Sequence, residues 1–414
     1  MNILQQMKHQ TVLVLGLGVT GLSCARFLQA NGVDFAVNDS RSHINIQPLY
    51  DISPTAHCVT GCWDTKLIAQ AEVIIASPGV DLTIPAIANA INSHCDVIGD
   101  VELFCQLTTV PVLAVTGSNG KSTVVSLLAH MAKSLGVNAV LAGNIGVPVL
   151  DLVNQPADCI ILELSSFQLE TVMSMSAVAA TVLNVSDDHL DRHQTFAIYS
   201  ALKHKIYTMA ETAVVSRQVE ANTSIPSNQQ LVSFGLDTCS APNFGLIYQE
   251  HQQYLAWGAQ PLVAVSELPI AGKHNVLNCL AALALGSTME WSVQGMANSL
   301  LTFTGLAHRC QRIITTDGRI WINDSKATNV GATIAAIEGL KDTANIILIA
   351  GGDGKGADFT PLAEVIETSV TQLITLGKDG GELAKLKPDS VQVQTLSEAV
   401  KEAALAVEGR AIHI

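Results

Sequence analysis

The chain has 414 residues and a formal net charge of −14, with 48% hydrophobic and 14% charged residues. This length predicts roughly two to four domains with large buried cores. The acidic balance argues against non-specific binding to nucleic acid, because phosphate backbones attract basic surfaces. Aromatic residues make up only 4%, and a chain rich in small aliphatic residues is typical of buried parallel sheets covered by helices.

Cysteine usage and hydropathy indicate the cellular compartment. The nine cysteines are an odd number and contain no Cys-x-x-Cys pair, which favours free thiols in a reducing compartment over a disulfide framework. No uninterrupted apolar run approaches the roughly 18 residues of a membrane-spanning helix. We therefore expect a cytoplasmic protein without a membrane span.

Short apolar strands alternate with helical patterns in the first segment, residues 1–105. Val12–Leu15, Phe35–Val37 and Val73–Ala76 have the composition of buried strands, and Leu22–Ala30 has that of a helix. Strands that alternate with helices form parallel α/β sheets. The segment is therefore predicted to be a Rossmann-like domain.

A glycine pattern stands where the first predicted strand meets the first helix. Gly16, Gly18 and Gly21 form it, and Asp39 lies near the end of the next strand. Glycines in this context let backbone amides approach a pyrophosphate at the helix N-terminus. The pattern predicts phosphate binding, without distinguishing NAD from a nucleotide sugar. The alternative is a tight strand-to-helix turn that binds no ligand.

The second segment, residues 106–305, has the pattern of another α/β domain. Its polar stretch 216–230 is predicted to be a loop, and Gly136 ends the first helix, as glycine commonly does. The predicted strands are Val112–Val115, Cys159–Leu162 and Ala179–Val185, and the predicted helices are 121–135, Phe196–Met209 and Asn275–Leu285.

The strongest single motif is Thr116-Gly-Ser-Asn-Gly-Lys-Ser-Thr123, between a predicted strand and a predicted helix. Its backbone amides can surround phosphates, Lys121 can neutralise phosphate oxygens, and the Ser122 hydroxyl can hold magnesium. The loop is shorter than the standard P-loop, because only two residues separate Gly117 from Gly120. The alternative, a solvated polar turn, is disfavoured by a Gly-Lys-Ser sequence that follows a strand.

Acidic and basic side chains follow two further strands of this segment. Glu163 ends one strand, where it can hold magnesium or orient water, although a strand-end glutamate often only faces solvent. In the run Asp187–His193, the residues His189 and His193 have the spacing of a zinc pair on a helix. No third ligand has suitable spacing, so magnesium held by His189 and an acidic neighbour is favoured over zinc. The alternative is a charged loop and helix cap.

Two other polar positions of the second segment stay ambiguous. Lys203 lies in a helical pattern, and its chemistry does not distinguish it from the neighbouring Lys205. His274, Asn275 and Asn278 lie at the start of a helix. Their amides can read an adenine edge, but helix capping by asparagine is the commoner explanation.

The third segment, residues 306–414, opens with a predicted β-hairpin. Asp317-Gly318 forms its turn, between strands at 313–314 and 320–322. Further strands are predicted at Ile346–Ile349 and Leu373–Leu376, in alternation with helices. The pattern again favours an α/β domain.

Two polar turns of the third segment are candidates for ligand binding. The run Asn323–Asn329 places an acid, a base and hydroxyls in one turn after a hairpin strand. The run Gly351–Gly356 follows another strand and resembles an anion loop, with Lys355 as its charge. A glycine-rich turn without a ligand is the alternative for the second run.

In order and spacing over the whole chain, these motifs resemble the Mur ligase family, whose ATP loop is a Thr-Gly-x-Asn-Gly-Lys-Ser/Thr sequence. The runs Ser-Ser-Phe-Gln-Leu-Glu and Asp-Ser-Lys-Ala-Thr-Asn point to the D-glutamate-adding branch, and the Asp-Asn-Pro-Arg motif of the diaminopimelate-adding relatives is absent. The matching segments are Gly143–Gly146, Glu163–Glu170, Asn184–Asp191, Leu306–Cys310 and Asn323–Asn329.

The resemblance implies three consecutive α/β domains with mainly parallel sheets. A P-loop-type central ATPase domain would stand between two Rossmann-like domains, with boundaries at 1–105, 106–305 and 306–414. It further implies a monomeric enzyme that uses ATP and two Mg²⁺ ions. The enzyme would join D-glutamate to UDP-N-acetylmuramoyl-L-alanine through an acyl phosphate, with the third domain closing over the central one.

The same resemblance implies a role for individual residues. The UDP-substrate would contact Gly18, Val19, Thr20, Ser40, Arg41, Asn144 and His189, where Ser40 replaces the family's usual threonine and keeps the hydroxyl. ATP would contact Gly117, Ser118, Asn119, Gly120, Lys121, Ser122, Thr123, Asn275, Asn278, Arg309 and Asp324. The metal ligands would be Ser122, Glu163, His189 and a carbamylated Lys203, the catalytic residues Lys121, Glu163, His189 and Lys203, and the D-glutamate ligands Thr328 and Lys355.

Three rival functions are open at this stage. An NAD-dependent oxidoreductase would use the Gly16–Gly21 pattern with Asp39, but it leaves the ATP loop without a role. A non-catalytic ATP-binding switch would not need Glu163, His189 and Lys203. A Mur ligase that adds another amino acid is the narrowest alternative.

The end of the chain carries a separate expectation. Arg410–Ile414 has the composition of the start of a buried strand and follows a predicted helix at Ser397–Val407. The resemblance implies that this strand continues into a further segment and a closing helix that help to hold D-glutamate. We therefore expect a C-terminally shortened third domain, with ATP and UDP-substrate binding retained and D-glutamate ligation weak or absent.

Overall fold

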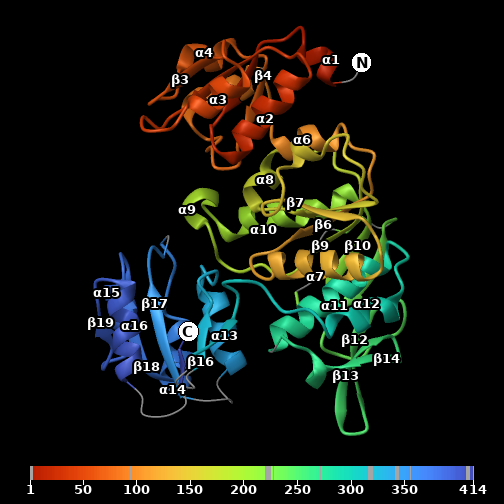
Figure 1. The fold of residues 1–414 in the computed structure, drawn as a ribbon, viewed down its shortest axis with the longest axis vertical. Helices are drawn as coiled ribbons and strands as arrows, with labels where there is room; N and C mark the ends of the chain where they lie inside the picture. Colours follow the sequence, from red (N-terminus) through yellow and green to blue (C-terminus); the bar gives the residue numbers. More distant parts are fainter. Residues whose placement is uncertain are drawn as a thin grey trace.

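The computed structural model describes residues 3–93, 95–219, 225–226, 228–270, 272–315, 320–340, 345–354, 356–406 and 411–413, without the side chains of 314 and 411–413. They form three lobes in chain order, each built on one β-sheet (Figure 1). The sheets are mainly parallel and covered by helices, so the predicted α/β fold class is confirmed.

The first lobe is a five-stranded parallel sheet of order β3-β2-β1-β4-β5. All four side chains of β1 are buried, because helices pack on both faces and strand side chains alternate between them. The predicted strands at Val12 and Val73 are confirmed, and two short strands, β3 and β5, escaped prediction. The strands are β1 (Val12–Leu15), β2 (Phe35–Asp39), β3 (His57–Thr60), β4 (Val73–Ala76) and β5 (Asp96–Ile98). The helices are α1 (Ile3–Met7), α2 (Val19–Ala30), α3 (Gln47–Ile52), α4 (Thr65–Gln70), α5 (Pro85–Asn92) and α6 (Asp100–Cys105).

The second lobe is a nine-stranded sheet of order β14-β13-β12-β11-β10-β9-β6-β8-β7. Its predicted strands and helices are present with shifted ends. The strands are β6 (Val112–Thr116), β7 (Ala139–Gly143), β8 (Cys159–Glu163), β9 (Ala177–Val182), β10 (Ala210–Ser216), β11 (Gln230–Phe234), β12 (Phe244–Gln249), β13 (Gln252–Trp257) and β14 (Gln260–Ala264). The helices are α7 (Lys121–Ser134), α8 (Ser166–Thr171), α9 (Leu190–His193), α10 (Phe196–His204), α11 (Lys273–Ser287) and α12 (Val293–Leu300), with 3₁₀ turns η1 (Val149–Leu152), η2 (Lys205–Met209) and η3 (Val265–Glu267).

The antiparallel end of this sheet, β12 to β14, was not predicted from the sequence. The turn between β12 and β13 places Glu250 and His251 at positive φ, 50° and 66°. Such turns are normally signalled by Asn-Gly or Asp-Gly, and this one uses neither. The local sequence therefore contains no strong hairpin signal.

The first and second lobes share one hydrophobic core. Val14 and Phe104 belong to the same buried cluster as Leu150 and Leu164 of the second lobe, and helix α6 lies against η1. On the other face of the central sheet, α7 packs against α11 and α12. Burial of these apolar side chains stabilises the arrangement of the first two lobes.

The third lobe is a six-stranded sheet of order β15-β16-β20-β17-β18-β19, in which only β15 and β16 run antiparallel. The predicted hairpin strands pair as expected, while the turn residues Asp317 and Gly318 lie outside the described part of the chain. Strand β20 lies between β16 and β17, as an interior strand. The strands are β15 (Gln311–Ile314), β16 (Ile320–Asn323), β17 (Asn345–Gly351), β18 (Val370–Leu376), β19 (Val391–Gln392) and β20 (Ala411–His413), and the helices are α13 (Val330–Leu340), α14 (Leu362–Ser369), α15 (Gly380–Ala384) and α16 (Leu396–Leu405).

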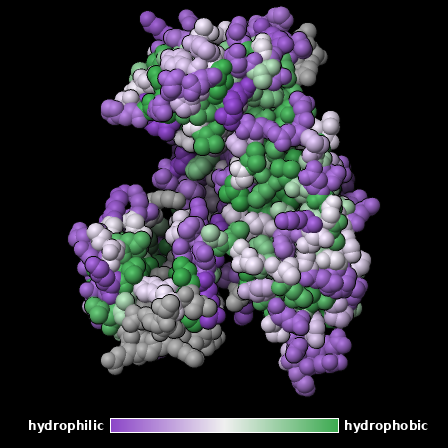
Figure 2. Space-filling view, in the orientation of Figure 1, coloured by the Kyte–Doolittle hydropathy of each residue, from purple (hydrophilic) through white to green (hydrophobic). Residues whose placement is uncertain are grey.

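Hydrophobic side chains reach the surface of all three lobes (Figure 2). In the same view a gap separates the lower part of the third lobe from the second lobe. Within the described ranges, no helix is both long enough and apolar enough to cross a membrane. All nine cysteines are free thiols.

Candidate functional site

The loop between β6 and α7 lies at the carboxyl edge of the central sheet. Gly120 adopts a left-handed conformation with φ of 84°. A Cβ atom there would lie 2.5 Å from the side-chain oxygen of Asn278, so only glycine fits. The backbone amide of Asn119 donates to Asn184 Oδ1 at 2.8 Å, and the Ser118 hydroxyl lies 3.0 Å from the Tyr199 hydroxyl. These contacts hold the loop open at the N-terminus of a 14-residue helix, a geometry suited to phosphate.

Two lysines meet beneath this loop. Lys121 Nζ donates to the carbonyls of Gly117 at 2.7 Å and Ser118 at 3.0 Å. Lys203 Nζ, from α10, donates to the same Gly117 carbonyl at 2.9 Å and lies 4.7 Å from the ring centre of Tyr199. Burial, and secondarily the charge of Lys121, holds the pKa of Lys203 well below its ordinary value. Burial also lowers the pKa of Lys121. Lys203 is therefore an amine that loses its proton easily.

Glu163 stands next to the lysines at the end of β8. Its side chain is 1% exposed, and Oε1 accepts a hydrogen bond from Asn144 Nδ2 at 2.7 Å. The other carboxylate oxygen, Oε2, is buried without a hydrogen-bond partner. A buried charged oxygen without a partner is costly. A cation bound at this position would satisfy Oε2.

His189 precedes the single-turn helix α9 in a left-handed conformation. Its ring lies edge-on to Phe167 at 4.9 Å, and Nε2 is 3.7 Å from Asp188 Oδ2. His193 does not pair with His189: its Nε2 lies 2.9 Å from Ser166 Oγ, and Phe167 stacks on its ring. No cluster of three or more His, Cys, Asp or Glu side chains able to hold a metal is present in the described ranges.

A cavity of about 210 Å³ lies beside the phosphate-type loop, between the second and third lobes. It brings together seven residues that the resemblance implies for ATP. Burial raises the pKa of one of them, Asp324, which accepts a hydrogen bond from the Cys310 amide at 3.1 Å. The residues of this set in the cavity lining are Asn119, Gly120, Thr123, Asn275, Asn278, Arg309 and Asp324.

The third lobe contacts the loop directly. Arg309 Nη2 donates to the Ser122 hydroxyl at 3.0 Å. The side-chain amides of Asn119 and Asn329 donate to each other, at 3.2 and 3.0 Å. Asn329 Nδ2 also lies 3.4 Å from Asp188 Oδ2. Residues about 200 positions apart in the chain therefore meet at one loop.

Five of the seven residues suggested for the UDP-substrate lie at the carboxyl edge of the first sheet, while Asn144 and His189 lie in the second lobe. Strands β1 and β2 are parallel neighbours, so Gly18, Val19 and Thr20 lie near Ser40 and Arg41. Asp39 is fully engaged: it accepts from the Leu17 amide at 2.7 Å and from Arg41 Nε and Nη2 at 2.9 and 2.7 Å. The hydrogen bond from Arg41 lowers the pKa of Asp39 to about 2.

This engagement weighs against NAD binding. In the dinucleotide fold, the acidic residue after the second strand accepts hydrogen bonds from a ribose. Here the carboxylate of Asp39 is 2% exposed and is used to hold the glycine loop and Arg41. The oxidoreductase alternative therefore loses the residue on which it depended.

Of the two residues suggested for D-glutamate, Thr328 and Lys355, the structure describes the first. Thr328 lines a cavity of about 790 Å³ in the third lobe, together with Asn329 and Gly352. The apolar side chains Leu362 and Val400 also line it. Lys355 lies outside the described residues.

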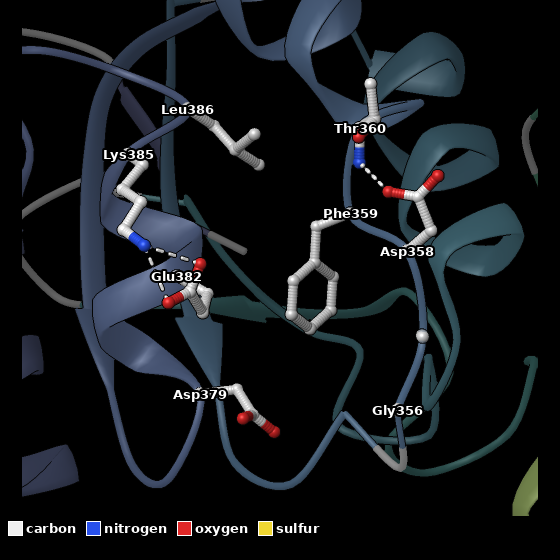
Figure 3. A pocket seen from close by; sticks show the side chains of 9 residues that line it. Gly356, Asp358, Phe359, Thr360, Asp379, Glu382, Lys385 and Leu386 are labelled. Carbon is white, nitrogen blue, oxygen red and sulfur yellow. Dashed lines mark hydrogen bonds and ion pairs between the residues drawn. The ribbon is translucent and has the colours of Figure 1, made fainter.

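A further cavity of about 380 Å³ lies beside the end of the glycine-rich run Gly351–Gly356, with Gly356 in its lining (Figure 3). The ring of Phe359 points into it, opposite a segment that carries Asp379, Glu382 and Lys385. Lys385 Nζ is 2.7 Å from both carboxylate oxygens of Glu382, and Asp379 accepts a hydrogen bond from the Gly354 amide. Its charged groups are thus paired within the protein, and the cavity shares no lining residue with the site at the ATP-type loop.

Three contributors to the site were given no role of their own from the sequence, although Asn184 and Lys326 lie in runs that it marked. Asn184 and Tyr199 hold the loop, and Lys326 lines the nucleotide-sized cavity. Asn184 opens the Asn-Val-Ser-Asp-Asp-His run, so its position before the acidic run was the available signal. Tyr199 had no local signal, because an aromatic residue in a helix is usually part of the core.

Three family models match the chain in succession. They are "Mur ligase MurD-like, N-terminal domain" over residues 10–99, "Mur ligase middle domain" over 115–286, and "Mur ligase, glutamate ligase domain" over 308–414. Together they span most of the chain. The motifs that carried the resemblance lie in the same three stretches.

Two relatives with the same name are similar over nearly the whole chain. The UDP-N-acetylmuramoylalanine–D-glutamate ligase of Colwellia psychrerythraea is 52% identical, over 97% of this chain and 91% of that protein. The ligase of Marinobacter nauticus is 41% identical, over 96% and 90%. Among solved structures, MurF from Acinetobacter baumannii has a TM-score of 0.65 at 17% identity, covering 99% of this chain and 93% of that chain. MurC from Thermotoga maritima has a TM-score of 0.62 at 18% identity, covering 98% and 95%. The two structures show a likeness of fold alone.

Proposed function

The chain belongs to the Mur ligase family, and we propose that it joins D-glutamate to UDP-N-acetylmuramoyl-L-alanine at the expense of ATP, in peptidoglycan precursor synthesis. The observation that carries this function is the meeting of Lys121, Glu163 and Lys203 at one sheet edge. A pure ATP-binding switch needs the phosphate loop but not a buried carboxylate and a second buried lysine, whose pKa burial lowers. The names of the relatives supply the choice of amino acid.

We assign one step of substrate handling to each domain. Residues 1–105 would bind the UDP-substrate through Gly18, Val19, Thr20, Ser40 and Arg41. Residues 106–305 would bind ATP, and residues 306–414 would bind D-glutamate. Asn144, which holds Glu163 by a 2.7 Å hydrogen bond, would contact the muramoyl substrate together with His189. Thr328 and Lys355 would contact D-glutamate.

The chemistry requires activation of a carboxylate, because a carboxylate at neutral pH does not condense with an amine. The L-alanyl carboxylate attacks the γ-phosphorus of ATP, which gives an acyl phosphate and releases ADP. The neutral amine of D-glutamate then attacks the acyl carbon, phosphate leaves with the bonding electron pair, and the amine loses a proton. Positioning and charge neutralisation provide most of the catalysis of such transfers.

The residues at the loop fit a divalent cation. Glu163 Oε2 is buried without a partner, and Ser122, at the start of α7, is a buried hydroxyl residue. When bound, Mg²⁺ would supply neutralisation of phosphate charge. Two Mg²⁺ ions would be held by Ser122, Glu163, His189 and a carbamylated Lys203. Carbamylation needs the neutral amine that burial of Lys203 favours.

ATP would occupy the cavity between the second and third lobes. Lys121 and the amides of Gly117 to Thr123 would surround its phosphates, as in other phosphate loops. Asn275 and Asn278 would approach from α11, while Arg309 and Asp324 would approach from the third lobe. Because the acyl phosphate reacts with water, closure of the third lobe over the loop would protect it.

We also propose a cytoplasmic monomer that binds small molecules and no nucleic acid. The free cysteines agree with a reducing compartment. The net charge of −14 disfavours a nucleic-acid partner.

The test is phosphate release from ATP with UDP-N-acetylmuramoyl-L-alanine and a panel of amino acids. We expect release with D-glutamate and little with L-glutamate, D-alanine or diaminopimelate. Release with another amino acid alone would assign the chain to a different branch of the family. Tight binding of NAD, with no binding of the UDP-substrate, would restore the oxidoreductase alternative.

A further inference from the structure

The backbone that presents His189 is strained. His189 has φ of 54° and ψ of 33°, and Gln194, just after the helix, has φ of 66°. Left-handed conformations are unfavourable for residues other than glycine, so they persist where surrounding contacts impose them. Helix α9 between them has only four residues, too few to be stable alone. Side-chain contacts of the segment must therefore hold His189 in place.

Arg192, on this short helix, makes the strongest of those contacts. Its Nη1 and Nη2 donate to Glu170 Oε1 and Oε2 at 2.6 and 2.8 Å, a two-pronged pair. Both side chains are largely buried, at 14% and 15% exposure. A planar guanidinium matches a carboxylate in this way, and the desolvated pair is worth more than a surface ion pair.

The same guanidinium reaches into the first lobe. Nη2 donates to the Val80 carbonyl at 3.0 Å, and Nε lies 3.4 Å from Asp81 Oδ1. Val80 and Asp81 belong to the loop after β4, at the edge of the sheet where the proposed UDP-substrate residues lie. Arg192 thus binds both helix α8 of its own lobe, the second, and the loop after β4 in the first lobe.

Phe167 connects Arg192 to His189. The ring centre of Phe167 is 4.9 Å from that of His189 and 5.6 Å from the Arg192 guanidinium carbon. Phe167 and Glu170 lie on α8, whose start is fixed by a reciprocal capping box between Ser165 and Gln168. The contacts of Arg192 with Glu170 and Phe167 are therefore made to a capped helix, α8, whose Phe167 ring also packs against the His189 ring.

We propose that Arg192 is a positioning residue. It fixes the His189 imidazole through Glu170 and Phe167, and it ties this part of the second lobe to the first-lobe loop at Val80 and Asp81. This inference rests on the proposed function, because His189 matters there as a metal and substrate ligand. Arg192 itself touches no reacting atom. Its loss should disturb use of the UDP-substrate and of magnesium, while binding of ATP by the loop Gly117–Thr123 should continue.

The decisive variant is Arg192→Lys, because lysine keeps the charge but cannot form the two-pronged pair and the carbonyl contact together. We expect kcat to fall roughly 10- to 100-fold, as for other small misplacements of catalytic groups. The half-saturating magnesium concentration and the Kd for UDP-N-acetylmuramoyl-L-alanine, measured by calorimetry, should each rise about fivefold or more. The Kd for a non-hydrolysable ATP analogue should change less than about twofold.

Arg26→Lys is the matched control. Arg26 Nη2 pairs with Asp151 at 2.9 Å and also joins the first and second lobes, but it lies away from His189. We expect nearly unchanged kinetics for this variant. Glu170→Gln should reproduce the defect of Arg192→Lys, and the double variant should be no worse than the worse single one, because the two side chains act as a unit.

Three results would overturn the inference. The first is an Arg192→Lys enzyme with wild-type kcat, magnesium dependence and UDP-substrate affinity. The second is an equal defect in Arg26→Lys, which would indicate lobe tethering in general. The third is a parallel loss of ATP-analogue binding and thermal stability, which would indicate a structural role only. If the wild-type chain binds no UDP-substrate, the proposed function itself falls and the inference falls with it.

Discussion

Lys121 and Lys203 donate hydrogen bonds to the same acceptor, the carbonyl oxygen of Gly117, at 2.7 and 2.9 Å. Two ammonium groups this close repel each other in a buried site. The pKa of Lys203 is lowered well below its ordinary value, first by burial and then by the charge of Lys121. Both causes favour the neutral form of Lys203, which the proposed carbamate requires.

Removal of the Lys203 amine tests the carbamate. We expect Lys203→Ala to be nearly inactive in phosphate release, and acetate or another short carboxylate to restore part of the activity by replacing the anionic group. Lys205→Ala is the control, because Lys205 is on the adjacent turn and donates a hydrogen bond to the Leu169 carbonyl at 3.2 Å. Full activity of Lys203→Ala in bicarbonate-free buffer would rule the carbamate out.

Lys121→Ala tests the phosphate loop. Loss of its charge in a closed site should lower phosphate release by about 100-fold or more, the range seen when one transition-state donor is removed. The fold should be intact, as judged by an unchanged thermal melt. Lys133→Ala removes an exposed lysine from the same helix and should have no effect. Near-normal turnover by Lys121→Ala would contradict the proposed role of the loop.

Arg309→Ala tests the contribution of the third lobe to ATP binding. Its guanidinium lies 3.0 Å from the Ser122 hydroxyl across the lobe boundary, and a charged hydrogen bond is worth about 1.5–3 kcal/mol. We expect the KM for ATP to rise roughly 10- to 100-fold, as such an energy implies. Arg312→Ala, an exposed residue on β15, serves as the control. An unchanged KM for ATP in Arg309→Ala would place ATP away from the third lobe.

Asp100→Asn tests a buried carboxyl group near the contact of the first two lobes. Asp100 is 5% exposed, its Oδ1 has no hydrogen-bond partner, and burial raises its pKa from 3.8 to about 6. As pH rises, the unfolded chain loses this proton first, so the group weakens the folded state progressively between pH 4 and about 6. The full shift corresponds to about 3 kcal/mol at most.

We therefore expect Asp100→Asn to increase the free energy of unfolding at pH 7.5 by up to about 3 kcal/mol and to change it little at pH 4. Urea unfolding at the two pH values measures this. A gain of the same size at both would mean that packing of the amide, and not removal of the charge, is responsible.

Local features were predictable from the sequence. The strands at Val12 and Val112 are short runs of β-branched and aliphatic residues, and both faces of these strands are buried. The loop Gly117–Ser122 follows from glycines and a lysine placed between a strand and a helix. Such signals lie within about ten neighbouring residues and depend on backbone conformation, so they can be read without knowledge of the fold. The same holds for the three-lobe order, which follows from strands alternating with helices.

Only the tertiary structure decided what those residues do together. Nothing local separates Lys203 from Lys205, yet Lys203 is 1% exposed and bonds a carbonyl 86 positions away. Asn329 likewise meets Asn119 across 210 positions. Parallel strands bring their carboxyl ends to one sheet edge, and that edge collects side chains from distant segments. Burial, and with it the lowered pKa of Lys203, is a property of the packed molecule, because desolvation depends on every neighbour that excludes water.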